Sequence, residues 1–253
     1  MIATTPQQIE YLRTSGTYLS EILRAVSARA TAGTSAKDLD TFAEGEIRAR
    51  GALPVFLNYR GNAAAYPYPA SICISINDEV VHGIPVSEKI IQDGDIVSLD
   101  LGLSYNGFIT DAAVTLVVGN STPEQQKLID ATYEALAAGI RAAKVGGHVE
   151  DIGAAISEVA QKYGVSVVQD LGGHGTGKAL HEAPYIANFG TMGKGEVLKE
   201  GMVLALEPIF TLGRGAIKLM PDRWTYTTKD GSLAAHVEHT ILIGKNGAEI
   251  LTL

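Results

Sequence analysis

The stretch Leu171-Gly-Gly-His174-Gly-Thr-Gly-Lys-Ala-Leu-His181-Glu-Ala-Pro184 carries two histidines on a segment with four glycines and a closing proline. Glycine costs conformational entropy and weakens ordinary helices and strands. A run this dense therefore indicates a main chain that approaches another group closely or adopts unusual dihedral angles. Taken alone, the segment also fits a surface loop with two incidental histidines. Acidic residues elsewhere in the chain argue against that alternative.

Four acids lie in apolar, strand-forming sequence, where an unpaired carboxylate is unfavourable once it is buried. Two of them occupy the arms of a predicted hairpin that turns at an Asn-Gly pair, a strong hairpin signal. The other two lie in apolar runs of the second half of the chain. The four residues are Asp100, Asp111, Glu207 and Glu238.

The hairpin register brings two of these acids together. With the Asn-Gly pair as the turn, Asp100 lies opposite Ala113, and Gly102 lies opposite Asp111. Asp100 and Asp111 then share one face as diagonal neighbours, roughly 7–8 Å apart. Two carboxylates on one face repel each other unless a positive group lies between them. The alternative, in which both aspartates face solvent, stays open at this point.

Length and composition restrict the class of protein. The chain has 253 residues, with 46% apolar and 19% charged residues and no linker-like tract, so we expect a single domain over residues 1–253. The net charge of −8 argues against a nucleic-acid surface. Cys73 is the single cysteine, which excludes an internal disulfide and fits a reducing compartment. With no signal-like start and no apolar run near 18 residues, we expect a soluble cytoplasmic protein without membrane contact.

The order of elements predicts an α+β fold with an internal duplication. Proline-capped or glycine-flanked amphipathic helices come in two pairs, one pair before each of two similar strands. In each strand a turn glycine, Gly94 or Gly201, is followed six residues later by an acid. The sequence therefore predicts two helix-helix-strand halves, about 1–120 and 121–253, around a central antiparallel sheet. The segment from Leu53 to Ala70 is rich in Gly, Asn, Pro and Tyr, which predicts an irregular loop.

The four acids and His174 form an oxygen-rich set of possible metal ligands. Structural zinc sites use Cys or several His instead. Carboxylates that bridge suit two divalent cations roughly 3.5–4 Å apart at a hydrolytic centre. Co, Mn, Fe and Zn all fit, because affinity order alone does not choose among them. A His-Glu-x-x-His helix is excluded, since Tyr185 stands where its second histidine would be.

Several separated motifs, in this order, resemble those of the type I methionine aminopeptidases, metallopeptidases of the pita-bread fold. The resemblance implies that that fold is present and that two metal ions are held by Asp100, Asp111, His174, Glu207 and Glu238. The motifs are Cys73-Ile-Ser-Ile-Asn-Asp-Glu-Val-Val-His82-Gly-Ile-Pro, Gly94-Asp-Ile-Val-Ser-Leu-Asp100, Asp111, Gly173-His174-Gly-Thr-Gly, His181-Glu-Ala-Pro, Gly201-Met-Val-Leu-Ala-Leu-Glu207-Pro and Glu238-His-Thr.

The resemblance also implies an activity, removal of the initiator methionine from peptides and nascent proteins. A metal-activated hydroxide would attack the carbonyl after the first residue, and Glu207 would carry the proton. His181 would donate to the developing oxyanion, and His82 would contact the scissile peptide nitrogen or the nearby substrate backbone. We expect a monomer with transient ribosome contact. An apolar pocket would hold the methionine side chain, formed by Tyr59, Tyr68, Cys73, Leu180 and Trp224.

Three departures from the family pattern concern the surroundings of the metal set. Extra residues, Asn62 to Pro67, stand where the family runs almost directly on. Leu180 replaces a common aromatic residue, and His236 stands where Gln is frequent. None of these residues is a predicted ligand. We therefore expect activity to survive and side-chain preference to broaden.

Two other functions fit parts of the same pattern. An Xaa-Pro peptidase shares the fold and all five ligands, but such relatives usually carry a large extra N-terminal domain, whereas a helix begins here just after Thr5. A pita-bread binding module without catalysis typically loses ligands, and this chain has all five. Both alternatives rest on analogy at the level of the fold.

Overall fold

The computed structural model describes residues 1–61 and 66–253, and its helices fall where the sequence predicts them. Two of them start at a threonine whose hydroxyl accepts a hydrogen bond from the backbone amide three residues later, Thr5 from Gln8 and Thr122 from Gln125. The helices are α1 (Pro6–Ser27), α2 (Ala36–Ala49), α3 (Pro123–Ala142) and α4 (Val149–Tyr163).

A central antiparallel sheet of nine of the described strands joins both halves of the chain. Its order is β1-β4-β5-β14-β9-β7-β8, with β2 beside β4 and β15 beside β14. The strands are β1 (Leu53–Pro54), β2 (Ile72–Ile76), β4 (Ile96–Tyr105), β5 (Phe108–Val117), β7 (Gly172–Gly175), β8 (Glu182–Ala187), β9 (Val203–Leu206), β14 (Glu238–Gly244) and β15 (Gly247–Ile250).

Two further sheets have three strands each. Their orders are β13-β10-β6 and β11-β12-β3. The strands are β3 (Glu79–Val81), β6 (Ser166–Val167), β10 (Ile209–Thr211), β11 (Ile217–Leu219), β12 (Tyr226–Thr228) and β13 (Ala234–His236).

The β4–β5 hairpin has the predicted register. Asp100 lies opposite Ala113, and Gly102 lies opposite Asp111. Leu99 and other odd-numbered positions of β4 belong to the core beneath α1 and α2. Asp100 and Asp111 point to the other face of the sheet yet are only 8% and 3% exposed. The solvent-facing alternative for these aspartates is therefore wrong.

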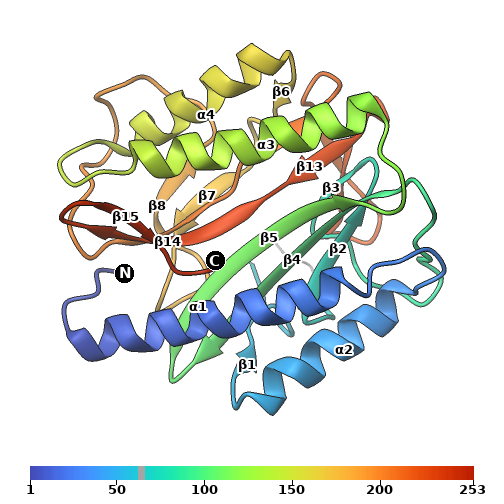
Figure 1. The fold of residues 1–253 in the computed structure, drawn as a ribbon, viewed down its shortest axis with the longest axis horizontal. Helices are drawn as coiled ribbons and strands as arrows, with labels where there is room; N and C mark the ends of the chain where they lie inside the picture. The colour runs from blue at the N-terminus through green and yellow to red at the C-terminus, as the bar shows by residue number, and fades with distance from the viewer. Residues whose placement is uncertain (62–65) are drawn as a thin grey trace.

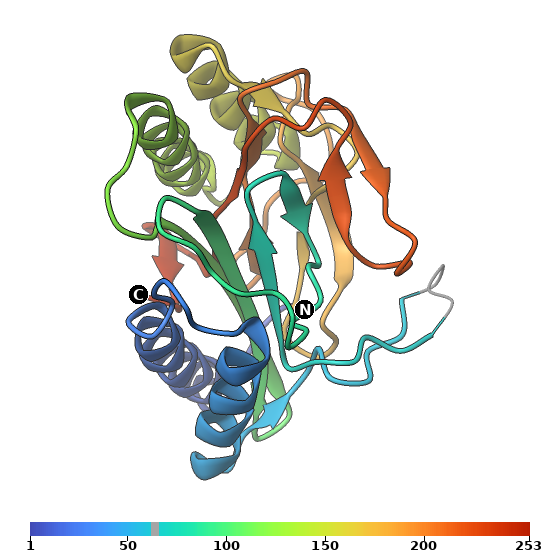
Figure 2. The same cartoon turned by 90° about the vertical axis from the view of Figure 1, so that its right-hand side faces the viewer.

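The helices cover one face of the curled sheet (Figures 1 and 2). Buried side chains of α1 and α2 pack against β2, β4 and β5, and those of α3 and α4 pack against the strands of the second half. Each helix pair thus has its own apolar core, and the α+β arrangement of two similar halves agrees with the sequence prediction. The opposite face of the sheet remains for the acidic side chains.

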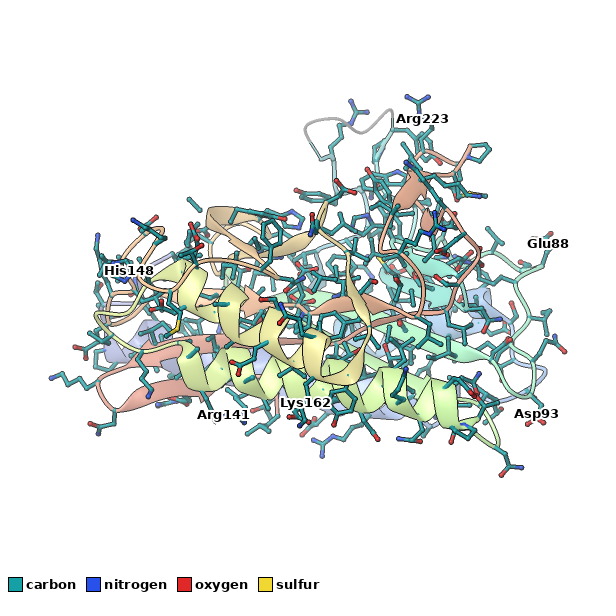
Figure 3. All side chains as sticks on the ribbon, turned by 90° about the horizontal axis from the view of Figure 1, so that it is seen from above. Glu88, Asp93, Arg141, His148, Lys162 and Arg223 are labelled. Carbon is teal, nitrogen blue, oxygen red and sulfur yellow. The ribbon has the colours of Figure 1, made fainter. Side chains whose placement is uncertain are left out.

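The outer surface of the helices is charged. Figure 3 labels Arg141 on α3 and Lys162 on α4, and Lys162 lies 2.6 Å from Glu134 of α3. None of the helices in the described part of the chain combines the length and hydropathy needed to cross a bilayer. One boundary differs from the prediction, because Leu53 and Pro54 within the expected loop pair with β4 as strand β1.

Candidate active site

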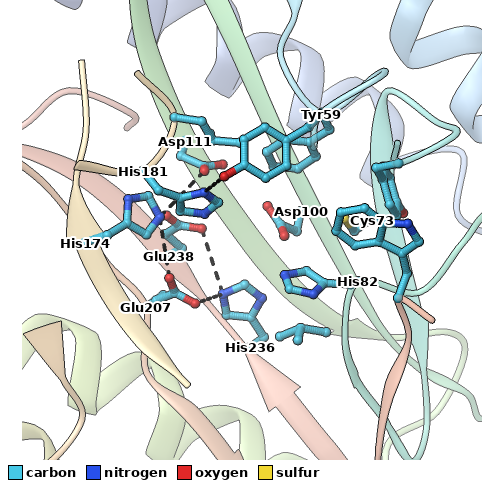
Figure 4. Close-up of a pocket in the computed structure, with 15 residues that line it drawn as sticks. Tyr59, Cys73, His82, Asp100, Asp111, His174, His181, Glu207, His236 and Glu238 are labelled. Carbon is cyan, nitrogen blue, oxygen red and sulfur yellow. Dashed lines mark hydrogen bonds and ion pairs between the residues drawn. The ribbon is translucent and has the colours of Figure 1, made fainter. Parts of the chain in front are cut away.

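Five side chains from five neighbouring segments meet on the open face of the sheet (Figure 4). They lie on β4, β5, β14, β7 and directly after β9, which are consecutive in the sheet order β4-β5-β14-β9-β7. Neighbouring strands therefore bring together residues that are more than a hundred positions apart in sequence. The five are the predicted ligands Asp100, Asp111, Glu238, Glu207 and His174, and all of them line one cavity.

The glycines around His174 let β7 fit between β8 and β9. A Cβ on Gly173 would lie 2.2 Å from the carbonyl oxygen of Ala205, and one on Gly175 would lie 2.2 Å from that of Ala183. Any larger residue would push the neighbouring strands apart. The dense glycine run is thus explained by close backbone approach, as the sequence predicts.

The backbone fixes which nitrogen of His174 faces the cavity. Its Nδ1 lies 2.9 Å from the carbonyl oxygen of Gly175, which only accepts, so Nδ1 carries the proton and donates. The lone pair of Nε2 then points toward two carboxylates, 4.0 Å from Asp111 Oδ2 and 3.6 Å from Glu207 Oε1. This arrangement is typical of a metal-binding imidazole.

The donor atoms fit a divalent cation. Ligand atoms of Asp111, His174 and Glu238 all lie within 4.8 Å of one another. Buried oxygens of Asp100, Asp111 and Glu238 have no hydrogen-bond partner within the described ranges. Unpartnered buried carboxylate oxygens are costly, and a bound cation would satisfy them. Together with the family shown below, the cluster supports the use of divalent metal.

Burial shifts the pKa of every ionisable group in the cluster toward its neutral form. The pKa of Asp111 rises to about 7. Burial, with repulsion from neighbouring acids, raises the pKa of Asp100, Glu207 and Glu238 well above the usual range. Burial lowers the pKa of His174 to about 3. Without a cation, the cluster would therefore hold protons at neutral pH.

Two further predicted histidines flank the acids. The hydroxyl of Tyr59 lies 2.6 Å from Nδ1 of His181, whose ring centroid is 4.4 Å from that of His174. His82 lies on the other side of the cavity, with its ring edge-on to those of Trp224 and Tyr226 at interplanar angles of 82° and 65° and centroid distances of 6.2 and 6.1 Å. Burial lowers the pKa of His82 to about 4. His82 is therefore neutral at pH 7 and lines the cavity, contrary to the solvated position usual for a turn histidine.

An apolar pocket adjoins the acids. All of the predicted wall residues line the cavity, Tyr59, Tyr68, Cys73, Leu180 and Trp224. The cavity has a volume of about 80 Å³, room for roughly five to eight water-sized atoms. One unbranched side chain fits in such a space.

Sequence reasoning left three lining residues out of the site, Phe56, Val81 and His236. His236 could have been found, because strand alternation places it on the same face as Glu238. Phe56 lies in the segment predicted as a loop and gave no periodic signal. Of the extra residues Asn62 to Pro67, the first four lie outside the described residues. The hydroxyl of Tyr66 donates to the carbonyl of Asp222, in the turn before Trp224.

Comparison with known proteins assigns the class that this fold and cluster define. The sequence profile of metallopeptidase family M24 matches residues 10–245, so the chain belongs to that family. A prolidase from Pyrococcus furiosus has the same fold, with a TM-score of 0.74 at 25% identity, and this chain covers 65% of its length.

Within that family the chain belongs with the methionine aminopeptidases. It is 45% identical to the methionine aminopeptidase of Aquifex aeolicus over 97% of this chain and 96% of the relative. The crystal structure of the methionine aminopeptidase from Thermotoga maritima superposes with a TM-score of 0.94 at 41% identity, covering 100% of this chain and 99% of that one. The pita-bread fold is therefore confirmed.

Proposed function

We propose that the chain is an aminopeptidase that removes methionine from the N-termini of peptides and nascent proteins. The observation that carries this proposal is the junction of two environments in one cavity, a buried cluster of four carboxylates and His174 beside an apolar pocket for one side chain. The first supports hydrolysis, and the second supports selection of an apolar first residue. The similarity to methionine aminopeptidases over the full length supports the same substrate.

The proposed cofactor is a pair of divalent ions, Co, Mn, Fe or Zn, held by Asp100, Asp111, His174, Glu207 and Glu238. When bound, such ions would polarise the scissile carbonyl and lower the pKa of water. Asp111 and Glu238 lie on paired strands, with Glu238 opposite Ala113, so their carboxylates are well placed to share ions. The predicted role of these five residues is to hold the ions in a fixed arrangement.

Three side chains would act on the substrate directly. Glu207 would take up and release a proton, because burial raises its pKa well above the usual range and favours the protonated form. His181 would donate from Nε2 to the developing oxyanion, since Tyr59 engages its Nδ1. His82, on the opposite wall, would contact the peptide backbone after the first residue. The pocket around Trp224 would hold the thioether side chain.

The test is hydrolysis of Met-Ala-Ser peptides by the purified protein with Mn²⁺ or Co²⁺, with free methionine measured by mass spectrometry. We expect methionine release by the wild type and its loss in His174→Ala and Glu207→Ala. His148→Ala serves as a matched control, because His148 starts α4 outside the cavity. Turnover by His174→Ala equal to the wild type would contradict the assigned site.

The same peptide panel separates the alternative activity. Xaa-Pro substrates are included with Met and other residues in the first position. Release of the first residue only before proline would favour an Xaa-Pro peptidase. No hydrolysis with any of the four metals, together with retained peptide binding, would favour a binding module.

We further propose that the protein works as a cytoplasmic monomer with transient ribosome contact. Its one cysteine, Cys73, is buried and free, which suits a reducing compartment. The net charge of −8 disfavours strong contact with ribosomal RNA, so any such contact would be brief. Sedimentation with and without ribosomes tests both proposals, since a stable dimer or salt-resistant ribosome binding would contradict them.

A further inference from the structure

His236 has a buried ring nitrogen that faces two of the proposed metal ligands. Its side chain is almost completely buried, and its Nε2 has no hydrogen-bond partner among the residues that the structure describes. Nε2 lies 3.5 Å from Glu207 Oε2 and 3.8 Å from Glu238 Oε2 (Figure 4). The Nε2 side of the ring thus points at both carboxylates.

The backbone holds His236 firmly in this place. Its amide lies 3.1 Å from the hydroxyl oxygen of Thr115, and that hydroxyl lies 2.6 Å from its carbonyl oxygen. Strand β13 pairs with β10, where His236 lies opposite Ile209. The backbone position of His236 therefore follows from these contacts and not from the carboxylates.

The chemistry of the neighbours fixes the role of the nitrogen. When these carboxylates hold a cation they are ionised and their oxygens only accept hydrogen bonds, so the nitrogen that faces them acts as an N–H donor. At 3.5 and 3.8 Å the contacts are longer than ordinary hydrogen bonds, and the N–H acts as a dipole directed at both groups. Glu207 is then flanked on both sides, with Oε1 facing His174 and Oε2 facing His236.

We propose that His236 is a positioning residue that orients the carboxylates of Glu207 and Glu238 for metal binding. The proposal rests on the metal centre of the proposed function. Groups that orient metal ligands typically change metal affinity by 10–100-fold when they are removed.

The experiment compares glutamine and methionine at position 236. The two side chains have similar length and shape, but only glutamine carries an N–H donor. The metal-free proteins are titrated with Mn²⁺ in a calorimeter. We expect His236→Gln to bind within about threefold of the wild type and His236→Met to bind 10–100-fold more weakly. His239→Gln is the control, because His239 lies on β14 with its Nδ1 2.9 Å from Thr252 and outside the cavity.

Thermal unfolding of each metal-free variant checks that it is folded, and His236→Ala repeats the comparison if the methionine variant is not. Wild-type affinity in His236→Met would overturn the proposal, as would equal weakening in the glutamine and methionine variants. The His174→Ala variant distinguishes a failure of the His236 proposal from a failure of the proposed metal centre. If His174→Ala keeps full Mn²⁺ affinity, the proposed metal centre fails, whatever the result at His236.

Discussion

At the scale of single residues, Tyr59 determines which form of His181 faces the substrate. A tyrosine hydroxyl that donates to Nδ1 leaves the proton of the neutral imidazole on Nε2, where it can donate into the cavity. We expect His181→Ala to lower kcat by about 10²–10³-fold, the loss typical of one oxyanion donor. Tyr59→Phe keeps the apolar wall and should lower kcat only about tenfold.

Steady-state kinetics on a Met-Ala-Ser peptide measure both variants of this pair. Leu53→Ala is a suitable control, because Leu53 is exposed and lies outside the cavity. Equal losses in His181→Ala and Tyr59→Phe would contradict the orienting role, since Tyr59 would then act on the substrate as strongly as His181.

The carboxylate cluster predicts an unusual pH dependence for the metal-free protein. At and above pH 6.5, no more than about half of the histidine side chains in the unfolded chain are protonated, so the buried carboxylates dominate the proton balance. Unfolded carboxylates are ionised there, whereas the pKa of Asp111 in the folded protein is about 7, and burial and neighbouring acids raise the pKa of Asp100 and Glu238 well above the usual range. The folded state then binds more protons than the unfolded state, so the free energy of unfolding falls as pH rises.

We therefore expect the unfolding temperature of the metal-free protein to fall between pH 6.5 and 8. Below pH 6.5 the lowered pKa of His174 and His236 acts in the opposite direction, because these groups disfavour folding when protons are abundant. Calorimetric scans in EDTA measure the trend, and Asp111→Asn should reduce it. A stability that rises with pH over this range would refute the protonated cluster.

The site residues were predictable to different degrees for physical reasons. Buried carboxylates in apolar strands are unfavourable enough to stand out, and strand alternation shows which face they share. Phe56 could not be found, because it reaches the pocket from an irregular segment without periodicity. The pKa of Asp111 depends on surroundings contributed by distant strands, so no local pattern contains it.

At the scale of elements, hairpins and helices follow local rules, whereas pairing between distant strands does not. The β4–β5 register followed from an Asn-Gly turn, and α1 and α3 from their caps. Strand β1 was missed, because two residues of pairing give no signal. The position of β7 between β8 and β9 became visible only in the structure, although its glycines indicated close approach.

Helix α1 offers a test of packing between elements. Gly16 on α1 is buried, and a Cβ there would lie 2.0 Å from the carbonyl oxygen of Leu251. Gly16→Ala should therefore lower the free energy of unfolding by about 1–3 kcal/mol, as overpacking usually does. Gly45, in the interior of α2, has nothing within 4 Å of such a Cβ. Gly45→Ala should raise stability by up to about 1 kcal/mol, through helix propensity.

Chemical denaturation of the metal-free proteins measures both changes. The two substitutions add the same atom to the same kind of element, so the difference between them isolates the contact with Leu251. If Gly16→Ala were as stable as Gly45→Ala, the tight approach of α1 to the C-terminal segment would be wrong.

At the scale of the whole molecule, the duplicated halves were predictable and their assembly was not. Repeated spacing from Gly94 to Asp100 and from Gly201 to Glu207 indicated two similar units. Their union depends on β5 pairing with β14, which places Glu238 opposite Ala113. Periodicity within either half contains no information on that pairing, so the sequence prediction included a central antiparallel sheet but not the order of its strands.

Because β5 pairs with β14, ligands from both halves of the chain meet at one site, so metal binding requires the whole fold. A cation that binds only the folded state stabilises it by RT ln(1 + [metal]/Kd), about 1.4 kcal/mol for each tenfold rise in free metal above Kd. For a chain of this size that corresponds to roughly 3–6 °C in unfolding temperature per bound ion. We expect the unfolding temperature to rise by this amount for each tenfold increase in free Mn²⁺, and we call this rise the metal slope. EDTA should abolish it.

The slope should disappear when either half loses a ligand, so Asp100→Asn and Glu238→Gln are expected to behave alike although they lie in different halves. Asp38→Asn should keep the slope, because Asp38 lies in the first turn of α2, outside the cavity. A slope that persists in both ligand variants would place the stabilising ion elsewhere. A slope lost in only one of them would mean that one half binds metal by itself, and then the pairing of β5 with β14 would not be needed to build the site.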